Sequence, residues 1–329
     1  EEFIWCKALE ERKARVLRDA GFDMDLDGAD VHSVQYQNAN NSVRLSDQFM
    51  EAVEQNKQWE LTARTDGAVI SRQPAQKLFR QIAEAAWECA DPGIQFSSTI
   101  NRWHTAPNTG PINASNPCSE YLHLDNSACN LASLNLLQFL DAENEDQFDL
   151  EGFSHAVRLV FTAQDILVGN ADYPTEPIAQ TSRDFRQLGL GYTNLGAMLM
   201  ALGLPYDSER ARAWTGAVTA LMSGHAYATS VDLAQRVGAF AGYTSNSEAM
   251  QQVLGRHRDA LKSVSGSAPP DLMSAAEKSW DDAVKGCQQH GIRNSQATVI
   301  APTGTISFMM DCDTTGIEPD LGLIKYKKL

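Results

Sequence analysis

The amino-acid sequence predicts an α/β fold with parallel strands. Segments of strand character alternate along the chain with segments of helical periodicity, as in strands joined by helical crossovers. The 329 residues are enough for a large core, in one barrel or in two domains. A hydrophobic fraction of 43% is ordinary for a globular protein. No internal repeat or low-complexity segment points to another architecture.

The chain opens with a charged helical pattern over residues 3–20, which Gly21 ends. Residues 23–28, Asp-Met-Asp-Leu-Asp-Gly, copy the start of a calcium-binding loop. Val34 occupies the twelfth position, where such a loop needs a bidentate glutamate. A plain acidic turn is therefore favoured over a calcium site. Residues 34–43 predict a strand followed by an amide-rich turn.

Two helices follow in the sequence pattern. Ser46 is a suitable cap for a helix over about 47–58. Pro74 fits the first turn of a helix over about 75–90. The apolar face of this second helix contains Leu78, Ile82, Ala85 and Ala86.

The remaining elements are mostly helical. Residues 130–140 are apolar and compatible with a helix, and residues 153–168 have an amphipathic helical pattern. Residues 183–240 read as mainly helical, with glycine and alanine that allow close packing. Residues 296–300 predict a buried strand that leads into a turn.

Charge and cysteine content limit the classes of function. The net charge of −15 argues against binding a nucleic-acid backbone, but a local group of backbone N–H donors can still hold a nucleotide phosphate. No apolar run is long enough to span a membrane, and the N-terminus lacks a signal-peptide pattern. Six cysteines are too few for a disulfide scaffold, so a reducing cytoplasm is expected. Cys6, Cys89 and Cys287 lie in helical patterns and read as packing residues.

Both ends look cut. The chain has no initiator methionine and begins directly in a helical pattern. Residues 322–329 read as a strand with nothing after it. We expect an internal piece of a longer protein.

The most informative stretch is residues 116–120, Asn-Pro-Cys-Ser-Glu, which a loop-rich segment precedes. If the stretch is extended, a two-residue period points Asn116, Cys118 and Glu120 to one side. A thiol, a carboxylate and an amide together can supply a reactive centre, a base and a hydrogen-bonding group. Cys129 adds a thiol eleven residues after Cys118. Taken alone, the stretch favours a structured loop with a small buried thiol.

A second motif covers residues 301–319, Ala-Pro-Thr-Gly-Thr-Ile-Ser-Phe-Met-Met-Asp-Cys-Asp-Thr-Thr-Gly-Ile-Glu-Pro. Pro302 sets a turn after a buried strand, and Gly304 lets the backbone approach a ligand. Thr303, Thr305 and Ser307 add hydroxyl groups. If a helix starts there, its N–H groups would hold a diphosphate. The alternative is a threonine-capped helix start, and the motif lacks the Gly-Lys-Ser/Thr of a Walker A loop.

The two motifs, in this order, resemble those of ribonucleotide reductases. The first resembles the active-site finger loop of that family, and the second resembles its phosphate-binding turn. The eleven-residue gap between thiols resembles the adenosylcobalamin-dependent, class II branch. The resemblance implies part of a ten-stranded α/β barrel with a central finger loop. Residues 1–329 would be a single catalytic barrel domain, incomplete at both ends.

The resemblance also implies a reaction, the reduction of ribonucleotides to 2′-deoxyribonucleotides for DNA synthesis and repair. Cys118 would be the thiyl radical that removes hydrogen from C3′, and Glu120 would take the 3′-hydroxyl proton. Asn116 would hydrogen-bond the ribose hydroxyls. Cys129 would be one of two reducing thiols and would form a disulfide with a partner upstream of residue 1. The substrate-binding turn would comprise Pro302, Thr303, Gly304, Thr305, Ile306 and Ser307.

The same resemblance implies the partners. Adenosylcobalamin would supply the radical, because side chains alone do not generate one readily. The substrate would be a ribonucleoside diphosphate or triphosphate, and the reductant a thioredoxin-type dithiol. A deoxynucleotide or ATP effector is expected, with its responsive loop near residues 23–28. The resemblance is also compatible with a homodimer in the cytoplasm.

Three alternatives stay open. A diiron partner subunit, as in class I, is the rival radical source. A structural zinc module would use Cys118, His123 and Cys129, with Cys312 as a fourth ligand, although the spacing is not a common zinc pattern. Otherwise Cys312 reads as a packing residue. A non-catalytic barrel fragment is the third alternative.

Overall fold

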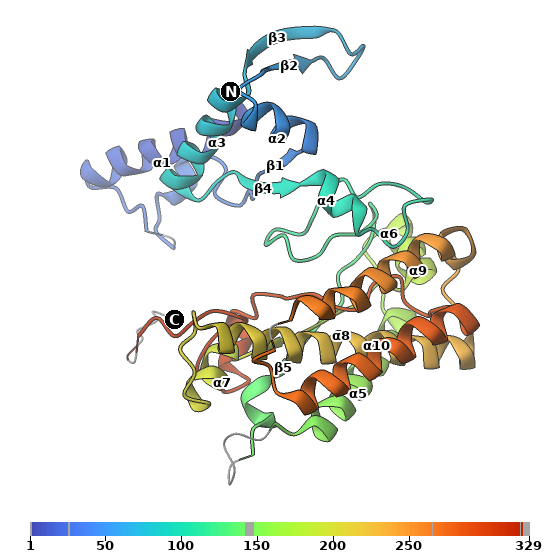
Figure 1. The fold of residues 1–329 in the computed structure, drawn as a ribbon. Helices are drawn as coiled ribbons and strands as arrows, with labels where there is room; N and C mark the ends of the chain where they lie inside the picture. Colours follow the sequence, from blue (N-terminus) through green and yellow to red (C-terminus); the bar gives the residue numbers. More distant parts are fainter. Residues whose placement is uncertain (1, 26, 142–147, 265, 323, 325–329) are drawn as a thin grey trace. The chain divides into compact units, whose positions relative to one another are not determined.

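The computed structural model describes residues 2–25, 27–141, 148–264, 266–322 and 324 (Figure 1). Contacts between residues divide the chain into two compact units, Glu1–Arg102 and Trp103–Leu329. Both units contain helices and strands, which agrees with the predicted α/β class.

The first unit contains four helices of at least six residues and two small sheets among its described residues. Strands β1 and β4 pair in parallel, whereas β2 and β3 form an antiparallel hairpin. Its core joins the apolar faces of the first three helices, around residues such as Ile4, Phe49 and Ile82. The elements are α1 (Glu2–Asp19), η1 (Val31–Ser33), β1 (Ser42–Leu45), α2 (Asp47–Glu54), β2 (Gln58–Thr62), β3 (Val69–Pro74), α3 (Ala75–Cys89), β4 (Gly93–Phe96) and α4 (Ser97–Arg102).

Helices α2 and α3 begin where their predicted caps place them, whereas α4 lies at the start of the segment predicted to be loop-rich. The Ser46 hydroxyl accepts a hydrogen bond from the Phe49 N–H at 3.2 Å, which satisfies a free donor in the first turn of α2. Pro74 directly precedes α3, and Gly21 follows α1 with a φ of 95°. Helix α2 ends at Glu54, earlier than predicted, because the β2–β3 hairpin begins at Gln58.

The strand predicted within residues 34–43 is wrong for most of its length, because β1 begins only at Ser42. Side chains from elsewhere satisfy the backbone before it. Glu10 accepts the Gln35 N–H at 2.9 Å, and Lys7 donates to the Ala39 carbonyl at 2.9 Å. These bonds replace a strand partner, so the segment forms a loop.

The acidic segment that follows α1 is a turn closed by its own groups. The Gly28 N–H donates to the Asp25 carbonyl at 2.8 Å, and the Asp23 N–H donates to an Asp30 carboxylate oxygen at 2.9 Å. The described residues of this turn therefore support a plain acidic turn. Leu26 lies outside the described residues.

The second unit packs helices around one short parallel sheet. Helix α8 packs against both α10 and α5, and all three are visible together in Figure 1. The large apolar core of this unit includes Phe153, Leu221 and Trp280. The elements are β5 (Leu131–Asn135), η2 (Leu136–Phe139), α5 (Leu150–Asn170), α6 (Glu176–Phe185), β6 (Gly189–Thr193), α7 (Leu195–Ala201), α8 (Glu209–Val237), α9 (Tyr243–Ala260), η3 (Leu261–Ser263), α10 (Pro270–His290) and η4 (Thr305–Phe308).

Two predictions for this unit need correction. Residues 131–135 form strand β5, followed by a short 3₁₀ helix, whereas a helix was expected. Residues 189–193 form strand β6 inside the segment predicted to be mainly helical. A short apolar run does not distinguish a buried strand from a helix, and here the pairing of β5 with β6 decides between them. The predicted helix at 153–168 is confirmed within α5.

A third extended segment lies along the other edge of β6. The Leu190 N–H donates to the Ala297 carbonyl at 3.0 Å, and the Val299 N–H donates back to the Leu190 carbonyl at 3.1 Å. Thr298 and Leu190 form a parallel bridge, which partly confirms the strand predicted at 296–300. A side chain at Gly191 would place its Cβ 2.5 Å from the Val299 carbonyl oxygen, so this close approach requires glycine.

The described strands form three two-stranded sheets and do not close into a barrel. Among the same residues, none of the helices has the length and apolar character needed to cross a membrane. All six cysteines are present as free thiols. Cys6, Cys89 and Cys287 lie on helices as predicted, and Cys287 is buried.

Candidate active site

The first motif forms a tight turn rather than an extended segment. The Ser119 N–H donates to the Asn116 carbonyl at 3.1 Å, and the Asn116 N–H donates to the Tyr121 carbonyl at 3.2 Å. Ser115 and Leu122 form an antiparallel bridge below the turn. The two-residue period expected of an extended strand therefore does not apply. Instead, the turn leaves Cys118 exposed.

The side chain of Asn116 takes part in this turn. Its Oδ1 accepts the Tyr121 N–H at 2.9 Å, which fixes the orientation of the carboxamide. The Nδ2 group is then the part of the side chain that can donate to a ligand. Asn116, Tyr121 and Cys129 line the same pocket, which has a volume of about 540 Å³.

Glu120 lines a different, smaller cavity of about 200 Å³. The side chain is half-buried, and its Oε2 atom is buried without a hydrogen-bond partner among the described residues. His104, His123, Tyr227 and His257 also line this cavity. His123 lines both cavities, so the predicted site residues lie on two sides of one histidine.

The Cys129 thiol is exposed on one side, yet its ionisation is strongly disfavoured. Protein atoms around the sulfur desolvate the thiolate and raise the pKa to about 12, and the negative charge of Glu120 adds to this effect. Cys129 is therefore protonated at neutral pH. The contribution of Glu120 brings the proposed base and the second thiol within electrostatic range of each other.

The three hydroxyl groups of the second motif differ in whether they bond within the protein or are exposed to solvent. Thr303 is buried, has a φ of 44°, and its Oγ1 lies 2.8 Å from the Ser133 hydroxyl oxygen in β5. Ser307 is buried and donates to the Gly304 carbonyl at 2.5 Å. Thr305 is the exposed member of the three. Two of the predicted hydroxyl donors are thus used inside the fold.

The helix expected after this turn is only the short 3₁₀ helix η4. Pro302, Gly304 and Ile306 are exposed, and a Cβ added at Gly304 would meet no atom within 4 Å. The backbone around Gly304 is therefore open to a ligand. A neighbouring pocket of about 420 Å³ is lined by Ser307, Cys312 and residues that follow.

Comparison with known protein families decides the family. A model of the ribonucleotide reductase barrel domain matches residues 1–329. The chain belongs to the ribonucleotide reductase family. The match covers both motifs and both compact units.

Individual relatives carry the names of B12-dependent enzymes. The vitamin B12-dependent ribonucleotide reductase of Streptomyces clavuligerus is 54% identical over 333 residues, covering 100% of this chain and 35% of the relative. That of Rhodopirellula baltica is 52% identical over 330 residues, covering 100% and 32%. A vitamin B12-dependent ribonucleoside-diphosphate reductase of Mycobacterium tuberculosis is 34% identical over 281 residues, covering 85% and 34%. The chain thus spans about a third of the length of these curated relatives.

Sequence reasoning missed the residues that anchor Cys129. Gln164 of α5 donates to the Asn130 carbonyl at 3.0 Å, and Asn130 Nδ2 donates back to the Gln164 carbonyl at 3.2 Å. The Ala128 N–H donates to the Ser182 hydroxyl at 3.3 Å. The signal available in the sequence was a glutamine, a polar residue, within the apolar face of the helix that became α5.

Asn194 is a second residue that the sequence did not reveal. It lies between β6 and α7, is fully buried and has a φ of 67°. Its Oδ1 accepts the Thr314 N–H at 2.9 Å, and its Nδ2 donates to Asn135 Oδ1 at 3.0 Å. It therefore ties the second motif to β5.

The structure gives no support to a zinc module. Across the described ranges, no cluster of three or more histidine, cysteine, aspartate or glutamate side chains could hold a metal ion. His123 Nε2 lies 2.8 Å from the Ser295 hydroxyl oxygen, so this nitrogen already has a partner. Cys312 is half-buried, in agreement with a packing role.

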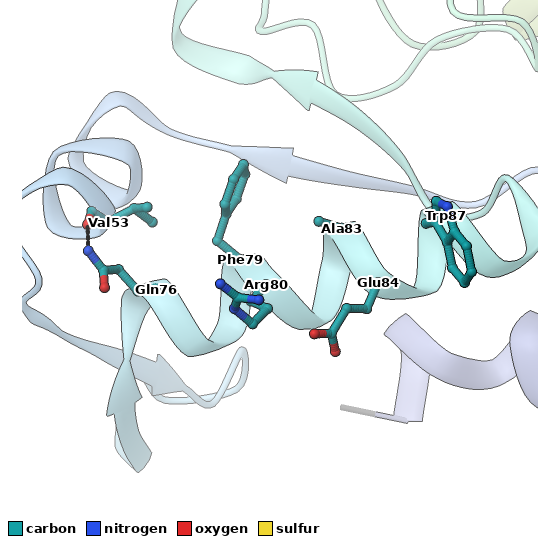
Figure 2. A pocket seen from close by; sticks show the side chains of 7 residues that line it. All are labelled: Val53, Gln76, Phe79, Arg80, Ala83, Glu84 and Trp87. Atoms are coloured by element: carbon teal, nitrogen blue, oxygen red, sulfur yellow. Dashed lines mark hydrogen bonds between the residues drawn. The ribbon is translucent and has the colours of Figure 1, made fainter.

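A further pocket, of about 550 Å³, lies within the first unit and contains none of the motif residues. Figure 2 shows its side chains along α3, with Val53 of α2 at one end and Trp87 at the other. Gln76 donates to the Val53 carbonyl at 3.0 Å, which closes that end. Trp87 is 89% exposed.

The raised pKa of Cys129 predicts slow alkylation. At pH 8 the thiolate fraction is very small, so iodoacetamide should modify Cys129 slowly, and the rate should rise steadily as the pH approaches 12. Glu120→Gln removes the nearby negative charge and should accelerate modification. Peptide mass spectrometry of time points would measure the rate. Rapid alkylation of Cys129 that reaches a plateau below pH 9 would contradict this prediction.

Proposed function

We propose that this chain is the central catalytic segment of a vitamin B12-dependent ribonucleotide reductase. The reaction is the reduction of ribonucleotides to 2′-deoxyribonucleotides for DNA synthesis and repair. The observation that carries the proposal is the match of the reductase barrel model to residues 1–329, together with relatives of that name at 54% identity. The proposed substrate is a ribonucleoside diphosphate or triphosphate.

The proposed architecture is part of a ten-stranded α/β barrel, with residues 116–120 in its finger loop. The parallel pairs β1–β4 and β5–β6 support it, as does the tight turn that presents Cys118. One barrel-domain model matches the whole chain, which supports a single catalytic domain. Coverage of about a third of each relative supports a barrel that is incomplete at both ends.

Each residue of the first motif has a chemical role in this proposal. The Cys118 thiyl radical takes the hydrogen atom from C3′, so an S–H bond forms as the C3′–H bond breaks. Glu120 accepts the proton of the 3′-hydroxyl, and the 2′-hydroxyl takes a proton from the reducing thiols and leaves as water. Asn116 Nδ2 orients the ribose, and its fixed carboxamide supports this role. The exposed position of Cys118 supports access to the sugar.

Cys129 is the proposed reductant. Its thiol and a partner thiol lose two hydrogens and form a disulfide. One of these hydrogens leaves with the departing water, and the other ends on C2′, where it replaces the hydroxyl group. A protonated thiol is the form that can give up a hydrogen atom, and the pKa of about 12 keeps Cys129 in that form. A thioredoxin-type dithiol is the proposed external reductant of the disulfide.

Adenosylcobalamin is the proposed cofactor, and it would supply the radical that removes the hydrogen atom from the Cys118 thiol. The exposure of Cys118 fits oxidation by a large group from outside the turn. The names of the relatives support this cofactor over a diiron partner subunit. Cys118 is the residue of this chain that would face the cofactor chemistry.

The proposed phosphate site is the turn formed by Pro302, Thr303, Gly304, Thr305, Ile306 and Ser307. The open backbone at Gly304 and the exposed Thr305 hydroxyl support contact with phosphate oxygens. Thr303 and Ser307 hold the shape of the turn through their internal hydrogen bonds. In this proposal, Gly304 and Thr305 contact the phosphate, while Thr303 and Ser307 keep the turn in shape.

Replacing Gly304 with valine should weaken nucleotide binding through phosphate, because a branched side chain would occupy the open space next to the backbone. We expect about a 10-fold loss for a nucleotide and a smaller loss for the matching nucleoside. Equilibrium dialysis with both ligands would measure the difference. Gly255→Val, which also enters open space but on α9, is the matched control. Equal losses for nucleotide and nucleoside would mean that the turn is only structural.

The proposal extends to an effector, an oligomeric state and a cellular location. A deoxynucleotide or ATP effector, a homodimer and a cytoplasmic location follow from the proposed enzyme class. Free thiols on all six cysteines agree with a reducing compartment. The net charge of −15 supports a protein that does not bind nucleic acid.

The decisive experiment assays the full-length gene product with adenosylcobalamin, a dithiol and no second subunit. We expect deoxynucleotide formation. Residues 1–329 expressed alone should show no multiple turnover, because the partner thiol for Cys129 is expected outside them. Turnover by the isolated residues would contradict the segment hypothesis. A requirement for a diiron subunit would move the protein to class I, and stoichiometric zinc without activity would favour the metal module.

A further inference from the structure

The proposed base Glu120 and the neighbouring His123 each have a buried polar atom without a hydrogen-bond partner among the described residues. His123 is only 4% exposed, and its Nδ1 atom has no hydrogen-bond partner among the described residues. The buried Oε2 atom of Glu120 likewise has no hydrogen-bond partner among the described residues. Both residues line the cavity of about 200 Å³. Buried polar atoms are nearly always hydrogen-bonded, so each of these two atoms requires a partner, and the cavity that both residues line has room for one.

Ser295 determines which nitrogen of His123 carries the proton. The Ser295 side chain is fully buried, and its hydroxyl oxygen lies 2.8 Å from His123 Nε2. The Thr105 hydroxyl donates to the Ser295 carbonyl at 2.6 Å and holds the residue in place. If the serine hydroxyl donates to Nε2, both groups are satisfied, whereas the opposite tautomer leaves a buried hydroxyl without an acceptor. The proton of neutral His123 therefore lies on Nδ1.

The imidazoles of this cavity are neutral near pH 7. Burial lowers the pKa of His123 to about 3, with a smaller contribution from His104. Burial also lowers the pKa of His104, and burial with the charge of Arg256 lowers that of His257 to about 4. Burial raises the pKa of Tyr227, which also lines the cavity, to about 12. Interaction of His123 with Glu120 is therefore a hydrogen bond and not an ion pair.

We propose that His123, oriented by Ser295, is a positioning residue for the Glu120 carboxylate. Its Nδ1–H donates to a water molecule in the cavity, and this water donates to Glu120 Oε2. The cavity has room for several water molecules, since each occupies about 30 Å³ in the liquid. The bridge fixes one carboxylate oxygen and leaves the other to take the proton of the substrate. The inference rests on the proposed function only in assigning Glu120 as the base.

His123 is well placed for this role because it lines both cavities of the site. The larger cavity contains Asn116 and Cys129, and the smaller contains Glu120. The ring of His123 packs edge-on against His104 and Phe185, with centroid distances of 5.8 and 6.0 Å, which holds it rigidly. A fixed donor between the cavities can keep the carboxylate aligned with the sugar.

Two substitutions test the two ring nitrogens of His123 separately. The amide of His123→Asn can place a donor where Nδ1 stands, but it loses the contact with Ser295. The amide of His123→Gln reaches the position of Nε2 and keeps that contact, but it loses the donor to the cavity. In the full-length gene product we expect His123→Gln to lower kcat on the order of 10-fold with KM unchanged. His123→Asn should retain most of kcat.

Nitrogen NMR of labelled histidine provides a readout that does not depend on turnover. With His123→Asn used to assign the signal, His123 should appear as the neutral Nδ1–H tautomer. Ser295→Ala should release a mixture of tautomers. An Nε2–H tautomer in the parent protein, or equal kcat losses for the asparagine and glutamine variants, would overturn the inference. If the parent protein lacks reductase activity, the proposed function fails, and the tautomer measurement still decides the Ser295–His123 part.

Discussion

Replacing Cys118 with serine is expected to abolish deoxynucleotide formation in the full-length gene product. The two side chains are similar in size, but the O–H bond of serine is much stronger than the S–H bond of cysteine. The serine hydroxyl therefore cannot give the radical that removes hydrogen from C3′. We expect a loss on the order of 10⁴-fold or more in turnover. Product analysis by chromatography would measure it.

Nucleotide binding should survive this substitution. Cys118 is exposed, and the turn around it is held by backbone hydrogen bonds in which the thiol takes no part. Calorimetric titration with the nucleotide should therefore give a nearly unchanged Kd. Cys6→Ser, a half-buried thiol on α1, is the control and should retain activity. Turnover of the Cys118 variant above a small fraction of the parent would remove this residue from the mechanism.

Glu120→Gln and Cys129→Ser are expected to fail at different steps. The first removes a base and keeps the size of the side chain, so hydrogen exchange at C3′ should fall by about 10²- to 10⁴-fold. The second removes a reductant, so hydrogen abstraction can begin while product does not form cleanly. Isotope exchange at C3′, measured beside product formation, separates the two steps.

The contrast between the variants provides its own control. Cys129→Ser should retain C3′ exchange at a level that Glu120→Gln does not reach. Both proteins should keep the thermal stability of the parent, because Glu120 and Cys129 line pockets rather than the apolar core. Matching defects in C3′ exchange would count against separate roles for the two residues.

Local signals predicted much of the helical structure. The cap at Ser46, the proline before α3 and the apolar periodicity of α5 each depend on residues close in sequence, and all three elements are present. The β2–β3 hairpin was not predicted. The loop before β1 depends on Lys7 and Glu10, which satisfy its backbone from a helix some 25 or more residues earlier.

The candidate site shows the same division between local and distant determinants. Its residue types could be predicted, because the thiol, carboxylate and amide lie within five positions. Their geometry could not, since the turn places Glu120 and Asn116 on different cavities. The inward use of the Thr303 hydroxyl depends on Ser133, which is 170 positions away in the chain. Such pairings exist only after the sheet has formed.

The contact between Gly191 and the Val299 carbonyl bears on how the chain tolerates sequence change. A methyl group at position 191 would push the third extended segment away from β6, and this segment leads directly into Pro302 and Thr303. Substitution of Gly191 would therefore be disfavoured by this close contact, although the residue performs no chemistry. In a saturation mutagenesis library selected only for stable protein, glycine should be retained at 191 while residue 118 varies freely. A second library, selected for cell growth that depends on the activity of the enzyme, should retain both glycine at 191 and cysteine at 118. Comparing the two libraries would separate residues needed for the fold from residues needed for catalysis.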